Sequence, residues 1–414
     1  NAYSCASNCA PARACLLSGQ YTPRHQIFNV GTGPRGKSEF RRLMHIPGVN
    51  VLDPNIVTWA QVAQSAGYRT ATMGKWHLSK DPLPYGFDVN IGGTQSGSPP
   101  RGYYPPHNVP GLRGSPKGEY LTDRLNDEAV GFIRKNKERP WFLYLTHFAV
   151  HTPLNSKREL IDKYEEKTAG KLHKNVAMAT MVQSVDDGVA EIFATLDELG
   201  LAENTITIFY SDNGGYVGAT DMAPLRGHKG TYYEGGIRVP FFVHWPGVVK
   251  AGRTDDPMTG VDLHPTLCSM IGADSPESQA QDGVDLVPFL KGETKAIGDR
   301  SLFWHFPAYL QAGSGSLEPR DPLFRSRPCS IIRKGDWKLH EYFEDGGIEL
   351  YNLADDIGER ENLVDKQPRK AQELLDELKQ WRQDIEAPVP TKLNPEYDAA
   401  KEADAIARAK QSRN

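Results

Sequence analysis

Short apolar runs alternate with longer amphipathic segments along most of this 414-residue chain. Runs typical of buried strands cover residues 69–73, 141–146, 205–210 and 239–244. Apolar residues recur at helical spacing over residues 56–66, 120–136 and 176–199. Strands that alternate with helices are typical of open α/β folds, so we expect a large mixed, mostly parallel sheet sandwiched by helices.

The pattern changes towards the C-terminus. A strand is predicted over residues 330–340, a turn over 345–347 and a returning strand over 348–353, followed by a helix over 368–385. This pattern indicates a smaller antiparallel sheet with one helix packed on it. Three prolines then precede an extended or weakly helical tail. The expected parts of the chain are residues 1–296, 297–387 and 388–414.

Polar residues with catalytic chemistry follow three of the predicted strands. The first strand runs into Gly-Lys-Trp-His at 74–77, the second into His147 and His151, and the third into Asp212-Asn213. The carboxyl ends of parallel strands meet at one edge of a sheet, and ligands bind there in open α/β folds. The sequence therefore predicts a functional site at this edge.

Composition narrows the function classes only slightly. The 48 basic and 52 acidic side chains give a net charge of −4, which argues against a general nucleic-acid binder. No apolar run reaches the length that spans a membrane. Five cysteines are few, and their spacing leaves both their pairing and the redox compartment open.

The segment that begins at Cys9 carries the most specific chemistry. Proline follows at Pro11, arginine at Arg13, and a short apolar run ends at Gly19. Proline favours the first turn of a helix and glycine its end, so a short helix is predicted. Cys9 would then lie at a helix N-terminus, which favours anions, and Arg13 would lie one turn further on the same face.

Cys9 alone has several interpretations. It could be a buried or disulfide-bonded cysteine beside a helix. A cysteine phosphatase loop needs its arginine six positions after the cysteine, whereas Arg13 is four positions after it. Zinc sites use close Cys and His pairs, and the spacing of Cys5, Cys9 and Cys15 does not supply one. A thiol protease remains open.

The whole set of motifs resembles the type I, formylglycine-dependent sulfatases of the alkaline phosphatase superfamily. These enzymes share C-x-P-x-R with a Leu-x-Ser/Thr-Gly ending, then Gly-Lys-Trp-His, His-x-Pro, Asp-Asn-Gly, and Gly-Lys-Gly-Thr with Glu-Gly-Gly. The matching segments occur in family order at 9–19, 74–78, 151–153, 212–214 and 226–240. The resemblance implies an alkaline-phosphatase-like fold and a sulfuric ester hydrolase.

The resemblance also implies a nucleophile. Cys9 would be converted to formylglycine, whose aldehyde hydrates so that one hydroxyl attacks the sulfur of a sulfate ester. Arg13 and Lys75 would hold the diol and the sulfate. His77 would take the proton from the second hydroxyl, which expels the sulfate.

The remaining family motifs imply a sulfate clamp and a metal site. His151 and Lys229 would clamp the sulfate and aid the leaving group, whereas His147 is expected to be a core histidine. Asp212 and Asn213 would bind Ca²⁺, with Mg²⁺ as the alternative. The family has two further aspartate ligands on an upstream strand. We expect that strand to lie outside residues 1–414, and those residues alone to be unstable and inactive.

The substrate is predicted from one loop and the aromatic content. The Gly/Pro-rich loop at 92–118 carries Arg101, His107 and Arg113, and His228 replaces a small residue of the Gly-Lys-Gly-Thr motif. With many aromatic residues, these side chains suit a sulfated carbohydrate. Two alternatives stay open. One is a phosphate or phosphonate ester hydrolase, and the other is an inactive protein that binds sulfated glycans.

Partners and location follow from this interpretation. We expect a sulfated small molecule or glycan as substrate and a formylglycine-generating or equivalent maturation enzyme as partner. No nucleic acid and no membrane span are expected. A periplasmic or extracellular location is predicted, with the signal segment outside this chain.

Overall fold

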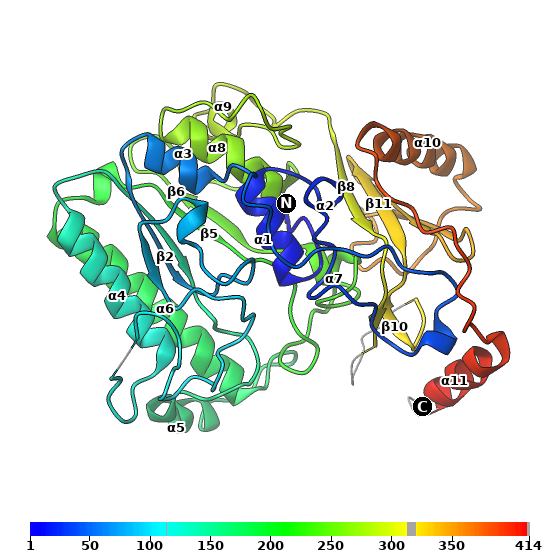
Figure 1. Ribbon diagram of the computed structural model, residues 1–414, viewed down its shortest axis with the longest axis horizontal. Helices are drawn as coiled ribbons and strands as arrows, with labels where there is room; N and C mark the ends of the chain where they lie inside the picture. Colours follow the sequence, from blue (N-terminus) through cyan, green and yellow to red (C-terminus); the bar gives the residue numbers. More distant parts are fainter. Residues whose placement is uncertain (113, 313–319, 412–414) are drawn as a thin grey trace.

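A computed structural model describes residues 1–112, 114–312 and 320–411, which form two parts lying side by side (Figure 1). The larger part contains the strands β1 (Ala2–Tyr3), β2 (Arg69–Gly74), β3 (Val89–Ile91), β4 (Trp141–Thr146), β5 (Thr207–Tyr210), β6 (Phe241–His244) and β7 (Met258–Thr259). Its helices are α1 (Cys9–Ser18), α2 (Thr22–His25), α3 (Trp59–Ser65), α4 (Leu121–Asn136), α5 (Ile161–Glu165), α6 (Val176–Glu198), α7 (Glu234–Ile237), α8 (Leu263–Met270) and α9 (Val287–Leu290). The smaller part contains β8 (Ser301–Phe306), β9 (Leu310–Gln311), β10 (Phe324–Ser326), β11 (Cys329–Lys334), β12 (Trp337–Tyr342), β13 (Ile348–Asn352), α10 (Pro368–Asp384) and α11 (Ala399–Gln411).

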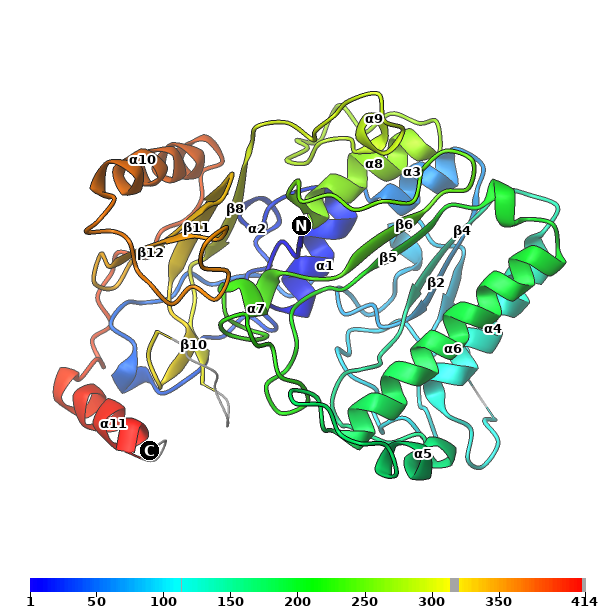
Figure 2. The same ribbon diagram turned by 180° about the vertical axis from the view of Figure 1, so that it is seen from behind.

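A parallel sheet in the order β3-β2-β4 brings the predicted strand ends together. Its register pairs Gly74 at the end of β2 with Thr146 at the end of β4. The helices α4 and α6 cover one face, and α1, α3 and α8 lie on the other (Figure 2). The expected layers of the α/β fold are therefore confirmed, and the segments after Gly74 and Thr146 leave the sheet as neighbours.

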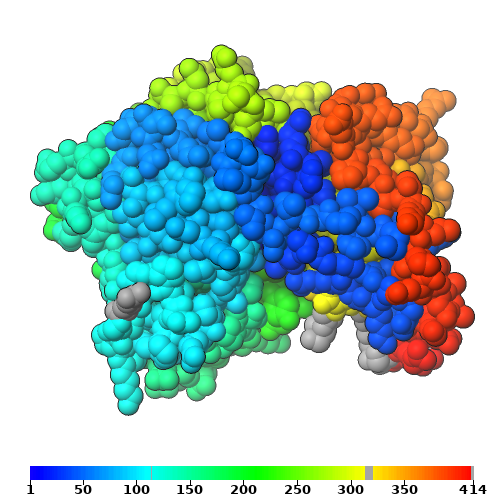
Figure 3. Space-filling model, viewed as in Figure 1, coloured from blue at the N-terminus to red at the C-terminus, as the bar shows by residue number. Residues whose placement is uncertain are grey.

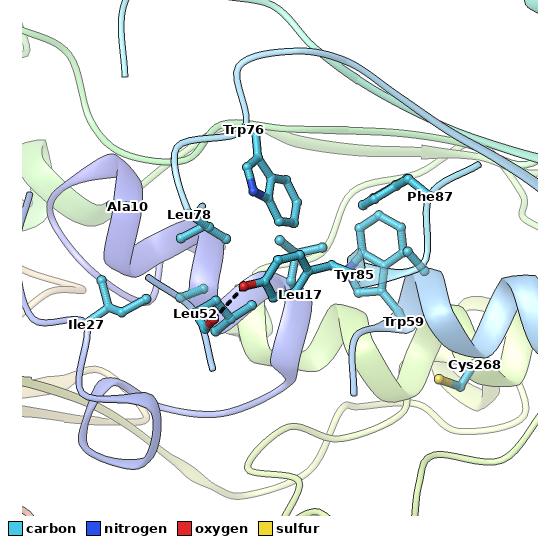
Figure 4. Packing of buried hydrophobic residues seen from close by; sticks show 12 residues of the cluster. Ala10, Leu17, Ile27, Leu52, Trp59, Trp76, Leu78, Tyr85, Phe87 and Cys268 are labelled. Atoms are coloured by element: carbon cyan, nitrogen blue, oxygen red, sulfur yellow. Dashed lines mark hydrogen bonds between the residues drawn. The ribbon is translucent and has the colours of Figure 1, made fainter. Parts of the chain in front are cut away.

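Alternate side chains of β4 enter two different cores, as expected for a strand buried on both faces. Phe142 and Tyr144 pack on the α1 side with Trp59, whereas Leu143 and Leu145 pack on the α4 side. Figure 4 shows the first core, in which aromatic and aliphatic side chains gather beside α1. This packing gives α1, and the residues at its N-terminus, a rigid support.

The sheet is less continuous than predicted among the described residues. There, β4 pairs only with β2, and β5 pairs antiparallel with β6 in a separate two-stranded sheet. Phe209 and Phe242 of this pair are 42 % and 66 % exposed, which is high for large apolar side chains in strands.

A four-stranded antiparallel sheet in the order β13-β12-β11-β8 forms the smaller part. One face packs on α10, where Phe303 stacks on Trp381 with ring centroids 4.5 Å apart. The other face packs on the larger part, where Trp304 donates its indole N–H to the Ser4 carbonyl at 2.7 Å. The predicted small sheet with one packed helix is confirmed.

The single strand predicted over residues 330–340 is wrong. The segment forms a hairpin in which Lys334 of β11 pairs with Trp337 of β12. Gly335 has a φ of 54°, the left-handed conformation that a two-residue turn requires and that glycine adopts at low cost. The apolar pattern continues through this turn, which explains why the sequence pattern indicated one strand.

Residues from the beginning of the chain also cross to the C-terminal part. Leu43 bridges to Leu393, and the amide of Met44 donates to the Lys392 carbonyl at 2.8 Å. In Figure 3 this blue segment runs across the face of the molecule to the red α11. The tail contains the helix α11. The predicted boundaries at 296 and 387 separate parts that are extensively packed together.

A fully buried charge cluster also joins the two parts. The Lys338 ammonium lies 2.9 Å from carboxylate oxygens of both Glu234 and Glu359, and all three side chains have no exposed surface. Tyr3 donates to Glu234 at 2.7 Å, and the His340 ring lies 3.3 Å from Glu359. Glu234 begins α7 in the larger part, so this cluster ties α7 to β12.

Candidate active site

Cys9 is buried at the first position of α1. The helix begins after Asn8, which has extended backbone, and ends at Gly19 with a φ of 70°, as the sequence predicted. Burial alone raises the pKa of the Cys9 thiol, but the charges of Lys75 and Lys229 outweigh it and hold the pKa well below its ordinary value. The Lys229 ammonium lies 3.9 Å from the Cys9 sulfur. The position of this sulfur therefore favours negative charge.

Arg13 organises the loop that follows β2. Its Nε donates to the Trp76 carbonyl at 2.9 Å, and its Nη2 donates to the Lys75 carbonyl. The Lys75 amide in turn donates to the Thr146 carbonyl at 2.6 Å, which ties the ends of β2 and β4 together. Arg13 therefore helps to set where the Lys75 side chain emerges.

Asp212 lies against these two cations. Its carboxylate is 3.8 Å from Arg13 Nη1 and 3.7 Å from Lys75 Nζ. Burial alone raises the pKa of Asp212, but Lys75 and Arg13 outweigh it and lower the pKa from 3.8 to about 2. The carboxylate is thus ionised at neutral pH.

Asn213 has the free amide oxygen expected of a metal ligand. Its Nδ2 donates to the Gly214 carbonyl at 2.9 Å, whereas its buried Oδ1 has no hydrogen-bond partner among the described residues. A buried amide oxygen without a partner is costly unless something binds it. The donor set of Asp212 and Asn213 fits a hard divalent cation. No cluster of three or more His, Cys, Asp or Glu side chains that could hold a metal is found within the described residues.

His77 adopts an unusual backbone conformation beside Cys9. Its φ is 68°, outside the regions that a residue with a side chain normally prefers. The ring is closely packed, because a Cβ added at Gly97 would lie 2.4 Å from its Cε1. Its buried Nδ1 has no partner among the described residues, and hydrogen bonding to His77 contributes to the lowered pKa of Cys9. Such strain is found most often at functional positions.

His151 and His147 differ in their surroundings. His151 Nδ1 lies 2.9 Å from the Thr152 carbonyl, so this nitrogen is the donor and Nε2 is the acceptor of a neutral ring. Burial is the largest cause that lowers the pKa of His151, and the charges of Lys229 and Lys75 lower this pKa further. Burial lowers the pKa of His147 to about 4. His151 therefore lies within the electrostatic field of the site, and His147 remains a neutral interior histidine.

The loop that carries Lys229 is fixed at both sides of the site. The Lys229 amide donates to the Gly215 carbonyl at 2.8 Å, and the Gly230 amide donates to the Ser7 carbonyl at 2.8 Å. These bonds join the loop to the Asp-Asn-Gly segment and to the residues just before α1. The structure thus brings together Cys9, Arg13, Lys75, His77, His151, Lys229, Asp212 and Asn213, as the motifs predicted.

The predicted substrate residues are placed less favourably. His107 is fully enclosed and lies 3.0 Å from Glu119, so its ring has no surface for a ligand. His228 is also buried, with Nδ1 2.9 Å from the Lys229 carbonyl. Both imidazoles are held in the interior, and their role in binding substrate stays a prediction. Arg101 is exposed, and Arg113 lies outside the described residues.

Several residues that shape the site carried no motif in the sequence. Thr146 donates its hydroxyl to the Lys75 carbonyl at 2.7 Å, and Tyr144 lies under the Arg13 guanidinium at 5.4 Å. Tyr103 donates to the His151 carbonyl at 2.9 Å. The sequence marks these residues only through the polar threonine and tyrosine at the end of β4, since polar residues at a strand end indicate a site.

The cysteines and helices show two further features. All five cysteines are buried and free of disulfides. No helix in the part of the chain described by the structure is long and apolar enough to cross a membrane.

Comparisons with known proteins agree with this geometry. The family model described as Sulfatase matches residues 1–273, and the model described as N-sulphoglucosamine sulphohydrolase, C-terminal, matches residues 228–387. A protein named Sulfatase from Formosa agariphila is 33 % identical over 89 % of this chain and 77 % of its own length. The Steryl-sulfatase of Mus musculus is 28 % identical over 94 % and 76 %. The crystal structure of Ps i-CgsB in complex with k-i-k-neocarrahexaose has a TM-score of 0.73 and 27 % identity, covering 100 % of this chain and 90 % of that one.

Proposed function

This chain belongs to the sulfatase family and is a sulfuric ester hydrolase, and we propose that it removes sulfate from a sulfated carbohydrate with Cys9, as formylglycine, at the reacting position. One observation carries the proposal. The buried Cys9 side chain has its pKa lowered by two lysines, beside the Asp212-Asn213 pair.

The reacting group at position 9 requires a modification. Formylglycine, once hydrated, would supply one hydroxyl whose oxygen attacks the sulfur and releases the alcohol, and a second hydroxyl whose deprotonation re-forms the aldehyde and breaks the C–O bond to the sulfate. The Cys9 sulfur occupies the place of these hydroxyls, and Lys229 lies 3.9 Å from it. We propose that a formylglycine-generating or equivalent maturation enzyme makes the conversion.

The surrounding cations are proposed to bind the sulfate. Lys75 and Lys229 both lower the pKa of Cys9, so both favour negative charge at the point where the ester must bind. Arg13 adds a third positive charge, and its two bonds to backbone carbonyls hold Lys75 in position. This fixed set of charges would stabilise the transition state without reorganisation.

The two histidines are proposed to move protons on opposite sides of the sulfur atom of the bound sulfate ester. His77 lies beside the thiol and would accept the proton of the second hydroxyl. His151 presents a neutral ring, because burial and nearby lysines lower its pKa. A bound sulfate ester brings negative charge, which counteracts the lysines and raises the proton affinity of His151. The anionic substrate itself would therefore prepare His151 to protonate the leaving oxygen.

A divalent cation is proposed at Asp212 and Asn213, with Ca²⁺ favoured and Mg²⁺ as the alternative. The unpartnered Oδ1 of Asn213 and the ionised Asp212 support this site. When bound, such a cation polarises sulfate oxygens. Ca²⁺ takes about six to eight oxygen ligands, so Asp212 and Asn213 would supply only part of its coordination shell.

A carbohydrate substrate is favoured over a steroid. The neocarrahexaose complex of Ps i-CgsB and the sugar in the name of the second family model support it. The exposed Arg101 stays a candidate for substrate contact. Because large sulfated glycans do not cross membranes, we propose that the protein works in the periplasm or outside the cell, which cell fractionation would test.

Turnover of paired esters tests the proposed function. The mature protein is assayed on an aryl sulfate, the matching aryl phosphate and a sulfated oligosaccharide, with Cys9→Ala as the inactive control. We expect higher kcat/KM for sulfate than for phosphate, and loss of turnover in Cys9→Ala. A preference for phosphate, or full activity of Cys9→Ala, would contradict the proposal.

A further inference from the structure

Two arginines lie beside the Lys229 loop, outside the set of residues described above. Arg325 is on β10, and its neighbour Ser326 donates to the Gly230 carbonyl at 2.8 Å. A Cβ added at Gly230 would lie 3.1 Å from Cδ and 3.3 Å from Nη1 of Arg325. The guanidinium therefore packs directly against the residue that follows Lys229.

Arg35 reaches the same place from the loop after α2. Its amide donates to the Tyr309 carbonyl at 3.2 Å, just before β9, the strand that pairs with β10. A Cβ added at the adjacent Gly36 would lie 3.4 Å from Cβ of Gln311, the residue whose carbonyl accepts from Arg325 Nε. In agreement with this placement, the charge of Arg35, together with the larger effect of burial, lowers the pKa of Arg325. Two like charges are thus held together by the backbone around one hairpin.

Neither arginine has a carboxylate partner among the described residues. Arg325 Nε donates to the Gln311 carbonyl at 2.9 Å, and Arg35 Nη2 donates to the Val30 carbonyl at 2.9 Å. Each guanidinium has five N–H donors, so most of them remain available. By contrast, Arg327, two residues beyond Arg325, pairs with three carboxylates at 2.5–2.7 Å.

Within the described residues, no carboxylate offsets these two like charges, and an anion bound between the arginines would do so. Both side chains are half-buried, so they remain open to a ligand. Tyr216, 37 % exposed, follows Gly215, whose carbonyl accepts from the Lys229 amide at 2.8 Å, so an aromatic residue lies next to the same loop. Forked guanidinium donors suit the oxygens of a sulfate or a carboxylate, and an aromatic face suits the CH face of a sugar.

We propose that Arg35 and Arg325 form a subsite for a second anionic group of the substrate, a sulfate or carboxylate on a saccharide, while the first sulfate reacts at Cys9. This inference rests on the proposed function and narrows it to saccharides with at least two anionic groups. The reacting sulfate would then lie at Lys229 and the second anion at Arg325, on either side of the loop around Gly230. A substrate with a single sulfate would leave the arginine pair unfilled.

Selectivity between substrates tests this subsite. We would measure kcat/KM for two otherwise identical disaccharides that carry one or two sulfates, in the wild type, Arg325→Gln and Arg35→Gln. Each loss of a charged hydrogen-bond donor should reduce the disulfated-to-monosulfated ratio about tenfold or more, mainly through KM. Lys37→Gln is the matched control, since Lys37 lies on the same loop, is exposed and pairs with Glu39.

A binding measurement distinguishes a failure of the subsite from a failure of the proposed function. Calorimetric titration of the same proteins with the disulfated disaccharide, and with one that has a uronate as the second anion, reports binding without turnover. Weaker binding in both arginine variants supports the subsite, and the tighter ligand identifies its anion. Unchanged ratios and unchanged affinities in both variants would overturn it. If the arginine variants lose binding but the wild type releases no sulfate, the subsite is retained and the proposed function is rejected.

Discussion

Replacing Lys338 by methionine should destabilise the protein more than any other single change of a lysine in the C-terminal part. The lysine is fully buried between Glu234 and Glu359, at 2.9 Å from each. Methionine has a similar length and no charge, so Lys338→Met leaves two buried carboxylates without their shared counter-ion. Removing one partner of a buried ion pair costs about 3–5 kcal/mol.

The remaining contacts place the expected cost at the low end of that range. Glu234 keeps the Tyr3 hydroxyl at 2.7 Å and Arg238 at 3.6 Å. Glu359 keeps the Glu234 amide at 2.6 Å. We therefore expect a loss of about 3 kcal/mol, which lowers Tm by about 3 °C in a chain of this size.

Lys334→Met is the matched control. Lys334 is on the neighbouring strand and lies 2.9 Å from Glu377, but both side chains are about a third exposed, at 36 % and 31 %. Exposed pairs contribute at most about 1 kcal/mol. Denaturant unfolding and thermal scans of both variants, at pH 5 and pH 8, measure the difference.

The pH dependence separates a charge effect from a packing effect. Burial already raises the pKa of Glu359 even with Lys338 present. Without the lysine that pKa must rise further, so at pH 5 a bound proton can replace the lost charge and the destabilisation should shrink. A Lys338→Met protein as stable as Lys334→Met, or one equally destabilised at both pH values, would refute this reasoning.

Three further predictions concern the histidines. Replacing His77 by alanine should stall the reaction after ester cleavage, seen as a sulfated protein by intact mass spectrometry; release of product at the wild-type rate would contradict its role as a base. Replacing His151 by alanine should slow poor leaving groups most, and an equal loss for good and poor leaving groups would exclude its acid role. Burial lowers the pKa of His25 and His305 to about 3, and that of His264 to about 4. Because these folded-state pKa values lie below the unfolded value, the stability that they provide is complete above pH 6.5 and is lost as the pH falls towards 4, by up to about 1.4 kcal/mol per pH unit for each ring. His305→Gln should flatten this slope in denaturant titrations, and an unchanged slope would count against it.

The motif residues of the site could be predicted from sequence because each follows a strand end or a helix start. Once β2 and β4 pair in parallel, the register places Gly74 beside Thr146, and the residues after them must converge. Cys9 is placed by the same local logic, since Pro11 and Gly19 define the ends of α1. Periodicity and end signals are local properties that a single sequence carries.

The surroundings of the site depend on contacts between distant segments. Arg35 and Arg325 come near each other only because the loop after α2 packs on β9 and β10. His107 looked like a substrate residue in a Gly/Pro-rich loop, but Glu119, twelve positions later, holds it in the interior. Such partners follow from tertiary packing, which leaves no periodic pattern in the chain.

The mass of the peptide that contains residue 9, measured in the same preparation whose sulfate ester turnover is assayed, tests the central claim most directly. We predict that the active protein carries the mass of an aldehyde in place of the Cys9 thiol, and that the rate rises in proportion to the converted fraction. A preparation with full turnover in which residue 9 is entirely unmodified cysteine would contradict the account.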